Sequence, residues 1–390
     1  MRRVRLKEFG TFYSGLSGKS KSDFSEGNAL LVTYRNIFNN PVLNPAIKDT
    51  VVVGKDEKQN EVLWGDILIT GSSETPADAG MSSVVLFNPQ EKMYLNSFCF
   101  GFRLNDMNEA LPSYIGHLLR STSIRAAISK TAFGVTRFNV NRMRFADIEI
   151  PLPPLNIQKE IVSILDSFTS LIGKMKQEVE MRKKQMEYYR EKLMAPQTNW
   201  KIKTLGEIGT FTRGNGLQKS DFRVKGFPCV HYGQIHTYYN TCIYKTKSFC
   251  EEDLAKKLQK ASYGDLLIAT TSEDVKACCK AAVWFGAGDV AYRGDSFCYS
   301  HDQDPKYMAY LFQTEMFAKQ KQKAATGAKV IRVSGESMAS FSFAFPPLVQ
   351  QRQIASILDT FETYISKLEK MIELRQKQYE YYREKLLTFE

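Results

Sequence analysis

The sequence predicts a mixed α/β (α+β) protein in which two globular domains are separated by two long antiparallel coiled-coil helices, with an internal pseudo-twofold repeat. Three observations support this fold class. A stretch that ends in YYREKL occurs twice, at residues 153–193 and 346–386. Both copies carry apolar side chains at helical spacing. Each copy follows a segment in which short strand patterns outnumber helical ones, which predicts a mixed α/β domain before each helix.

The repeated stretch shows that whole domains are duplicated. Its two copies read PPLNIQKEIVSILDSFTSLIGKMKQEVEMRKKQMEYYREKL and PPLVQQRQIASILDTFETYISKLEKMIELRQKQYEYYREKL. They align without a gap at a constant offset of 193 residues, and more than half of the positions are identical. This period is far longer than the roughly 20–50 residues of a solenoid repeat. We therefore expect two similar domains, each followed by a similar helix.

The apolar side chains of each copy recur at alternating spacings of three and four. The series are Ile161, Leu165, Phe168, Ile172, Met175, Val179, Met186, Tyr189 and Leu193, and Ile354, Leu358, Phe361, Ile365, Leu368, Ile372, Tyr379, Tyr382 and Leu386. An average spacing of about 3.5 residues is typical of a coiled-coil seam. The pattern predicts helices within residues 153–196 and 346–390, each spanning roughly 50 Å at 1.5 Å per residue. Two near-identical helices in one chain are most simply each other's antiparallel partners.

Length and composition indicate a globular protein of two or three domains. The chain has 390 residues, of which 43% are hydrophobic, and no apolar run approaches the length of a membrane span. The start MRRVRLKEFG lacks the apolar core of a signal peptide. The 7 cysteines include no CxxC pair, which favours reduced thiols over a disulfide or zinc framework. We expect a cytoplasmic protein without a membrane segment.

The net charge of +11 lies mostly outside the two long helices, in which basic and acidic residues nearly balance. A basic excess on the globular segments is compatible with a nucleic-acid partner. Ordinary solubilising charge is the alternative interpretation.

The first globular segment, residues 1–152, has a recognisable order of patterns. LKEFGTFYSG is followed by a polar loop, GKSKSDFSEGN, and by the apolar run ALLVTYRNI. VLWGDILITGSS and MYLNSFCFGFRL are strand patterns, and SYIGHLLRSTSIRAAISK has helical spacing. AFGVTRFNVNRMRFADIEIPLPPL closes the segment as a glycine loop that runs into a strand.

The second globular segment, residues 197–345, repeats this order of sequence patterns. LGEIGTFTRG corresponds to LKEFGTFYSG, FPCVHYGQI corresponds to ALLVTYRNI, and ASYGDLLIATTS corresponds to VLWGDILITGSS. The positions between these framework patterns differ in sequence. One scaffold with two sets of loops suits a protein that reads two different targets.

No constellation for catalysis is present. Residues 285–288 (FGAG) are superficially similar to a cofactor-binding glycine loop, but a strand pattern follows them, which favours a hairpin turn. Residues 304–307 (DPKY) predict a helix start with proline in the first turn. The isolated acids Glu273 and Asp274 are interpreted as solvated loop charges, and the histidines lack metal-ligand spacing. We predict no catalytic residue, no metal site and no cofactor on this chain.

Polar and basic residues at matching places in both halves are the candidate DNA contacts. Asn and Gln can bind the edge of adenine, Arg can bind guanine, and hydroxyl groups can bind phosphate. The candidates in the first half are Lys19, Lys21, Tyr34, Arg35, Asn36, Ser72, Ser73, Arg137 and Arg142. The candidates in the second half are Lys219, Arg223, His231, Tyr232, Gln234, Thr271, Ser272, Lys329 and Arg332. Each one alone is more often an ordinary surface residue, and the parallel placement supports the group.

The chain resembles the specificity subunits of type I restriction-modification systems. The resemblance covers essentially the whole chain and is carried by PPLNIQKEIVSILDSF and PPLVQQRQIASILDTF, by the two strands after Gly-Asp, and by both YYREKL endings. It implies two target recognition domains, residues 1–152 and 197–345, and two conserved spacer helices, residues 153–196 and 346–390. The family's base contacts vary, so none carries over to a residue of this chain.

The resemblance further implies a non-catalytic subunit that binds double-stranded DNA. Such subunits assemble with two methyltransferase subunits, which bind S-adenosylmethionine, and with restriction subunits, which use ATP and Mg²⁺. Each recognition domain reads one half of a bipartite site, and the helices set the spacing and dock the methyltransferase subunits. Two other functions remain open: a standalone DNA methyltransferase or nuclease, and a non-catalytic coiled-coil scaffold for other proteins.

Overall fold

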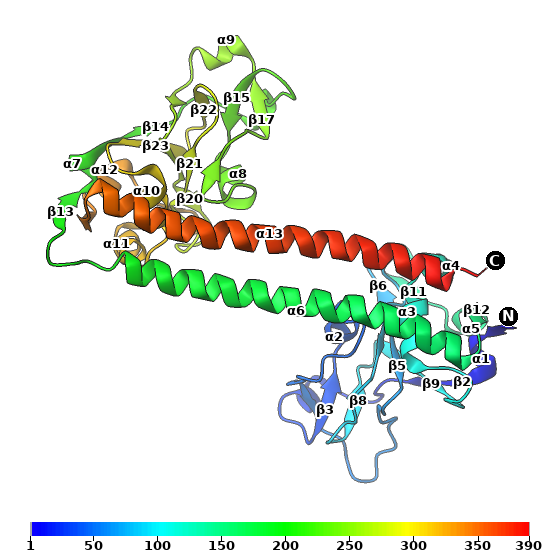
Figure 1. Cartoon of the computed structure of the whole chain (residues 1–390). Helices are drawn as coiled ribbons and strands as arrows, with labels where there is room; N and C mark the ends of the chain where they lie inside the picture. Colours follow the sequence, from blue (N-terminus) through cyan, green and yellow to red (C-terminus); the bar gives the residue numbers. More distant parts are fainter. Residues whose placement is uncertain (1, 390) are drawn as a thin grey trace. The chain divides into compact units, whose positions relative to one another are not determined.

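The computed structural model describes residues 2–389, which form two compact units. Unit 1 comprises Met1–Lys176 and Lys370–Glu390, and unit 2 comprises Gln177–Glu369. The two long helices are α6 (Leu155–Leu193) and α13 (Leu348–Leu387), shown in Figure 1. Each unit therefore contains one globular domain and part of both long helices, so the units cut across the consecutive segments defined from the sequence. No helix among residues 2–389 is both long and apolar enough to cross a membrane.

Unit 1 is a mixed α/β domain packed against the first part of α6 and the last part of α13. Its other elements are β1 (Arg2–Arg5), α1 (Leu6–Phe9), β2 (Gly10–Ser14), η1 (Lys21–Phe24), β3 (Ala29–Val32), α2 (Tyr34–Asn39), β4 (Thr50–Val51), β5 (Ile67–Thr70), β6 (Ser72–Ser73), β7 (Ser82–Val84), β8 (Met93–Leu95), β9 (Cys99–Leu104), α3 (Pro112–Leu119), α4 (Thr122–Ser129), β10 (Ala132–Phe133), β11 (Phe138–Val140), α5 (Arg142–Ala146) and β12 (Glu149–Leu152). They confirm the predicted mixed α/β class.

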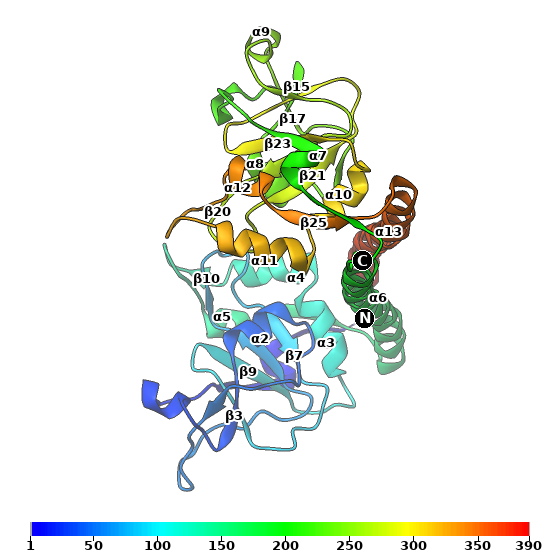
Figure 2. The same cartoon turned by 90° about the vertical axis from the view of Figure 1, so that its left-hand side faces the viewer.

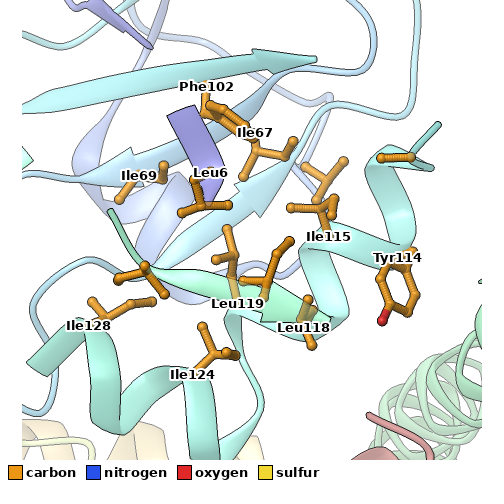
Figure 3. Close-up of a cluster of buried hydrophobic side chains, with 14 of the residues drawn as sticks. Leu6, Ile67, Ile69, Phe102, Tyr114, Ile115, Leu118, Leu119, Ile124 and Ile128 are labelled. Atoms are coloured by element: carbon orange, nitrogen blue, oxygen red, sulfur yellow. The ribbon is translucent and has the colours of Figure 1, made fainter. Parts of the chain in front are cut away.

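The centre of unit 1 is an antiparallel sheet with strand order β2-β9-β5-β7. Strand β5 is buried on both faces, because Ile67 and Ile69 join the core under α3 and α4, while Leu68 joins a second core with α2, β3 and β8. Figure 3 shows Ile67 and Ile69 together with side chains of α3 and α4, among them Ile115 and Ile128. Alternate side chains of a strand point to opposite faces, so the continuous apolar run ILIT suits this position.

Unit 2 repeats the design. Besides parts of the long helices, its elements are β13 (Lys201–Thr204), α7 (Leu205–Ile208), β14 (Gly209–Arg213), η2 (Lys219–Asp221), β15 (Phe227–Val230), α8 (Tyr232–Thr237), β16 (Cys242–Ile243), β17 (Ser248–Cys250), α9 (Glu252–Ala255), β18 (Lys260–Ala261), β19 (Leu266–Ala269), β20 (Thr271–Ser272), β21 (Lys280–Trp284), β22 (Val290–Tyr292), β23 (Ser296–His301), α10 (Pro305–Leu311), α11 (Glu315–Ala324), β24 (Ile331–Arg332), α12 (Gly335–Ala339) and β25 (Ser342–Phe345). Its central sheet has the order β14-β23-β19-β21-β16. In Figure 2, β15, β17 and α9 lie at the end of unit 2 that is remote from α11 and α13.

Two local predictions in unit 2 can be compared with the structure. Residues 286–288 form a bend, and the indole of Trp284 donates to the carbonyl oxygen of Gly288 at 2.8 Å. The prediction of a hairpin here is wrong, because the flanking strands β21 and β22 belong to different sheets and do not pair. Helix α10 begins at Pro305 and is capped by Asp304, so the predicted helix start with proline in the first turn is confirmed.

A buried glutamine anchors the start of each long helix. The side-chain amide of Gln158 donates to the carbonyl oxygens of Glu109 and Pro153 at 2.9 and 2.8 Å, and its oxygen accepts from the Leu111 amide at 2.9 Å. Gln351, the equivalent residue, likewise bonds the Pro346 carbonyl oxygen at 2.8 Å and accepts from a backbone amide. The glutamine of the repeated PPLxxQ motif therefore fixes the angle at which each helix leaves its domain.

Replacing Gln158 with alanine is expected to destabilise unit 1 by about 3 kcal/mol, because several backbone groups lose their only buried side-chain partner. The measurement is urea unfolding of the full chain followed by fluorescence. Asn156→Ala, an exposed change on the same turn, is the control and should cost about 0.5 kcal/mol or less. Equal costs for the two variants would contradict the anchoring role.

The aspartate of each SILD motif binds the helix of its own domain. In unit 1, Asp166 lies 2.8 Å from His117 Nε2 on α3. In unit 2, the Tyr310 hydroxyl on α10 donates to the equivalent Asp359 at 2.8 Å, and Lys306 pairs with the same carboxylate. The repeat thus keeps the aspartate and changes its partner.

The glutamate of each YYREKL motif binds the other domain. In unit 1, the Glu384 carboxylate on α13 accepts from the Thr122 amide at 2.9 and 3.0 Å. In unit 2, the equivalent Glu191 on α6 accepts from the Glu315 amide at 3.2 Å. Each YYREKL segment therefore packs in the unit of the other copy's domain.

Aromatic pairs show how the long helices run within each unit. In unit 1, Phe168 of α6 stacks on Tyr382 of α13, with ring centroids 5.4 Å apart. In unit 2, Tyr189 of α6 stacks on Phe361 of α13 at 5.6 Å. In each case one end of a helix meets the opposite end of its partner, which confirms the predicted antiparallel pairing.

Candidate nucleic-acid interface

In unit 1, a cleft of about 600 Å³ gathers several of the predicted contacts. Tyr34, Ser72, Ser73 and Arg137 line it together with Phe98. These residues come from α2, β6, the loop before β9 and the loop between β10 and β11. The structure therefore brings together side chains that are far apart in the sequence.

Arg137 is held at this cleft by two contacts. Its Nε donates to the Ser72 hydroxyl at 3.0 Å, and its guanidinium lies 5.1 Å from the ring centroid of Phe98. Both Arg137 and Phe98 are exposed, the latter by 58%. A planar guanidinium held in this way can present its remaining N–H groups to an acceptor pair such as O6 and N7 of guanine.

The loop that carries Arg137 is built on a glycine that both units share. Gly134 has a φ of 134° and the equivalent Gly327 has a φ of 101°, so both adopt a backbone conformation that favours glycine. A Cβ at Gly134 would lie 2.0 Å from the Arg137 carbonyl oxygen, and one at Gly327 would lie 2.1 Å from that of Val330. The loop geometry is therefore repeated, while Val330 stands where unit 1 has Arg137.

Three other candidates lie in the same unit. Arg142 donates to the Ser14 hydroxyl at 2.8 Å and lies 5.1 Å from the centroid of the Phe100 ring. Arg35 is exposed on α2. The Asn36 amide is already engaged, because it donates to the Asn44 carbonyl oxygen and accepts from the Asn44 amide at 3.0 and 3.1 Å. This geometry gives Asn36 a structural role in the loop after α2.

The two lysines of the first polar loop differ. Lys19 forms an ion pair with Glu57, and its side chain is only 8% exposed. Lys21 is exposed in η1. The charge of Lys19 is therefore balanced within unit 1, whereas Lys21 faces solvent.

In unit 2, His231, Tyr232 and Arg293 form a cationic and aromatic cluster. His231 caps α8 by accepting from the Gly233 amide at 3.0 Å through Nδ1, and its Nε2 lies 2.6 Å from an Arg293 nitrogen. The Arg293 guanidinium lies 5.7 Å from the Tyr232 ring centroid. Burial and the neighbouring Arg293 lower the pKa of His231, and Arg293 also forms an ion pair with Asp295 at 3.5 Å.

The remaining second-half candidates lie around two short strands. Thr271 and Ser272 form β20, which pairs with β24 so that Thr271 lies opposite Arg332. The ring of His236 lies 3.0 Å from the Thr271 carbonyl oxygen and connects α8 to β20. Lys329 is exposed in the preceding loop.

Three further candidates lie in α8 or in the first loop of unit 2. The Gln234 amide accepts from the His231 amide at 3.1 Å and donates to the Ser248 hydroxyl at 2.6 Å, so it too has a structural role. Arg223 forms an exposed ion pair with Glu251 at 2.8 Å. Lys219 is exposed in η2.

The loops after β6 and β20, residues 74–81 and 273–280, are called recognition loops 1 and 2. In loop 1, Arg125 of α4 donates to the carbonyl oxygens of Ala77, Ala79 and Gly80 at 2.6–2.7 Å. In loop 2, Lys321 of α11 donates to the carbonyl oxygens of Lys276 and Cys278 at 2.9 and 2.8 Å. A half-buried or buried cation on a later helix, α4 or α11, thus holds the backbone of each loop.

A left-handed residue completes each recognition loop. Gly80 has a φ of 69°, and Cys279, at the equivalent place, has a φ of 62°. Cys279 is the only residue other than glycine with a positive φ among residues 2–389. The two loops therefore share a left-handed residue at the same place although their side chains differ.

Sequence reasoning missed Phe98, Arg293, His236 and the two loop-holding cations. Phe98 and Arg293 fall within stretches that the sequence assigned to strand patterns, whereas the structure places them in the loops between β8 and β9 and between β22 and β23. Alignment of the two GD strands could have revealed that Gly80 and Cys279 are equivalent. Among residues 2–389 there is no group of three or more His, Cys, Asp or Glu side chains that could hold a metal ion.

Comparisons with known proteins agree on one family. The family model described as "Type I restriction modification DNA specificity domain" matches residues 1–181 and again residues 197–376. A Haemophilus influenzae protein named as a type I restriction enzyme specificity subunit is 30% identical over 66% of this chain and 68% of its own length. The specificity subunit of the Escherichia coli type I enzyme EcoR124I/EcoR124II is 28% identical over 62% of this chain and 63% of its own length. The matched regions thus span about two thirds of these relatives.

Solved structures share the fold. The crystal structure of a type I restriction-modification S subunit from M. genitalium covers 100% of this chain, with a TM-score of 0.57 and 15% identity. A chain from a structure concerning complex assembly and conformational transition of the type I R-M system covers 99%, with a TM-score of 0.59 and 14% identity. The matches cover 96% and 97% of the lengths of those two solved chains, respectively.

Proposed function

Because the chain belongs to the type I restriction modification DNA specificity family, whose role is DNA recognition, we propose that its two globular domains read the two halves of one bipartite site. One observation carries this proposal. The units repeat the same loop backbone around Gly134 and Gly327, yet they present Arg137 in one unit and Val330 in the other. One scaffold with different exposed side chains suits two different half-sites.

In unit 1, we assign the base contact to Arg137 at the cleft. Its position over Phe98 and against Ser72 favours a bidentate contact with guanine. The exposed cations Lys21, Arg35 and Arg142 are suited to phosphates, which position the protein without reading sequence.

In unit 2, we assign the contacts to two places. The cluster of His231, Tyr232 and Arg293 offers a charged guanidinium beside an aromatic ring. Arg332 and Lys329 are exposed in and before β24. The alternative roles as a coiled-coil scaffold or a standalone methyltransferase or nuclease receive no support from the family comparison.

Arg137→Ala is expected to relax discrimination by about 10–100-fold at one base pair of the first half-site, since a bidentate contact contributes roughly 1–3 kcal/mol. The second half-site should be unaffected. The measurement is methylation of a library of bipartite sites by the full complex. Lys174→Ala, which removes one exposed charge from α6, is the control. If both variants reduce methylation of all sites alike, Arg137 contacts only phosphate or nothing.

We further propose that the long helices dock two methyltransferase subunits. Equivalent apolar side chains are exposed on both helices: Ile164 and Leu171 are each 41% exposed, and Ile357 and Tyr364 are each 44% exposed. Two copies of one partner need two similar surfaces, and the repeat provides them. S-adenosylmethionine, ATP and Mg²⁺ would then bind to the methyltransferase and restriction subunits rather than to this chain.

The double variant Ile164→Asp with Ile357→Asp is expected to abolish assembly with the methyltransferase, because each docked surface would bury an unpaired charge. DNA binding by the chain alone should persist. Co-purification and labelled-methyl transfer measure the first effect, and electrophoretic shift measures the second. The neighbouring pair Ser163→Asp with Ser356→Asp adds the same charge about 100° around the helix and should retain more assembly.

The chain alone is proposed to be non-catalytic and to act in the cytoplasm. Incubation of the purified chain with duplex DNA and labelled S-adenosylmethionine should transfer no methyl group. Addition of the methyltransferase subunit should restore transfer. Transfer by the chain alone would contradict the proposal.

A further inference from the structure

Each recognition loop is connected to a long helix through one short helix. In unit 1, the Glu384 carboxylate of α13 accepts from the first amide of α4, at Thr122, while Arg383 contributes a contact at 3.2 Å to the same carboxylate. A carboxylate at a helix N-terminus satisfies an amide that has no partner within the helix. Glu384 therefore fixes the start of α4.

The same helix then holds the recognition loop. One turn after Thr122, Arg125 donates to three carbonyl oxygens of recognition loop 1. Loop 1 follows β6, whose Ser72 accepts from Arg137. The contacts thus form a continuous path from Glu384 to the side chain assigned to base reading.

Unit 2 contains the same path with other side chains. Glu191 of α6 accepts from the Glu315 amide, which begins α11. Lys321 on α11 is 6% exposed and donates to two carbonyl oxygens of recognition loop 2. The glutamate and the arginine before it, Arg383 or Arg190, are common to both copies, whereas the cation that holds each loop is Arg125 in one unit and Lys321 in the other.

We propose that Glu384 and Glu191 are positioning residues that set the placement of recognition loops 1 and 2, respectively. Each glutamate belongs to the long helix that follows the other domain. A change in the helix after the second domain should therefore alter reading of the first half-site, and a change in the first helix should alter reading of the second. This inference rests on the proposed function and names the residues that couple the helices to it.

Glu384→Ala is expected to lower discrimination in the first half-site by about fivefold, the size typical of losing a helix N-cap. Glu191→Ala should do the same for the second half-site only. The assay is methylation of a library of bipartite sites by the complete complex, with Arg137→Ala marking which half belongs to unit 1. Glu380→Ala and Glu187→Ala are the matched controls, since these exposed glutamates lie one turn earlier on the same helices.

A structural measurement makes the test independent of methylation. In Glu384→Ala, the amides of residues 122–125 and of loop 1 should exchange hydrogen faster than in Glu380→Ala, while loop 2 stays unchanged. If the alanine variant fails to fold, Glu384→Gln, which keeps an oxygen but loses the charge, should show a smaller shift in the same half-site.

The outcomes separate the two proposals. Suppose that the wild-type complex reads a two-part site. The positioning role is then overturned if Glu384→Ala lowers discrimination equally in both half-sites, or if it does not differ from Glu380→Ala. A wild-type complex without a two-part site would instead overturn the proposed function. Faster exchange in loop 2 on changing Glu384 would also contradict the assignment of each glutamate to one loop.

Discussion

A chain shortened to residues 1–194 is expected to form a homodimer that reads a symmetric site made of two first half-sites. Unit 1 needs the last part of α13, which such a chain lacks. The last part of its own α6 has nearly the same sequence, with Glu191 at the place of Glu384 and Tyr189 at the place of Tyr382. A second copy can therefore supply the missing segment in exchange.

The energetic argument concerns the contacts that α13 makes in unit 1. Glu384 caps α4, Phe168 stacks on Tyr382, and Leu387 is buried in the core. A monomer of the short chain would leave these surfaces exposed, which destabilises it. Stability should consequently increase with protein concentration, as for any obligate dimer.

One contact cannot be reproduced by the exchange. The ring Nδ1 of His117 lies 3.2 Å from the Tyr379 hydroxyl, and the equivalent residue of α6 is Met186. Met186→Tyr should therefore stabilise the short-chain dimer by about 1 kcal/mol per copy. Met181→Tyr, at a position that is 59% exposed, is the control and should have little effect.

The measurements are analytical ultracentrifugation, thermal unfolding at several concentrations, and methylation of symmetric sites in the presence of the methyltransferase. A folded monomer, or a dimer that methylates only the original asymmetric site, would contradict the exchange. If Met186→Tyr stabilises the short-chain dimer no more than Met181→Tyr does, the second copy does not occupy the place of α13.

Deletion of one heptad from both long helices is expected to shorten the gap between the half-sites by about three base pairs. Removal of residues 175–181 and 368–374 preserves the phase of the apolar seam. It removes about 10 Å of helix rise, which is close to three base pairs at about 3.4 Å each. The half-site sequences themselves should not change.

The location of the deletions favours folding of the shortened protein. Each deleted heptad spans the point at which its helix passes from one compact unit to the other. The stacked pairs Phe168–Tyr382 and Tyr189–Phe361 lie outside both deletions and within single units. The contacts that close each unit can thus survive.

A deletion of four residues is the control. It rotates the apolar face by about 40° relative to the partner helix and should lower folding stability. The measurement is methylome sequencing of cells that carry each variant. If the double heptad deletion folds and still methylates the original spacing, the helices are only docking surfaces, and the methyltransferase partners set the distance.

The candidate site was only partly predictable from the sequence. Tyr34, Ser72, Ser73 and Arg137 were predicted and do line one cleft. The amides of Asn36 and Gln234, which looked equally suited to bases, are bonded to neighbouring groups of their own domains. Residue type shows which contacts are chemically possible, but only the fold shows which groups are already used.

The sequence by itself determined the duplication, the extents of the long helices and the strands after Gly-Asp. These features depend on local patterns: a spacing of 3.5 residues indicates a helix seam, and the short apolar runs ILIT and LLIA indicate strands, which the structure shows to be buried throughout. The helices predicted within residues 153–196 and 346–390 are Leu155–Leu193 and Leu348–Leu387.

Only the tertiary structure decided which part of the chain completes each unit. The pairing of Glu384 with Thr122 joins residues 262 positions apart, and Glu191 meets Glu315 across 124 positions. Local patterns are identical in both copies, so they cannot tell whether YYREKL packs against its own domain or the other. The antiparallel packing within each unit resolves this, because it brings the end of one helix to the start of its partner.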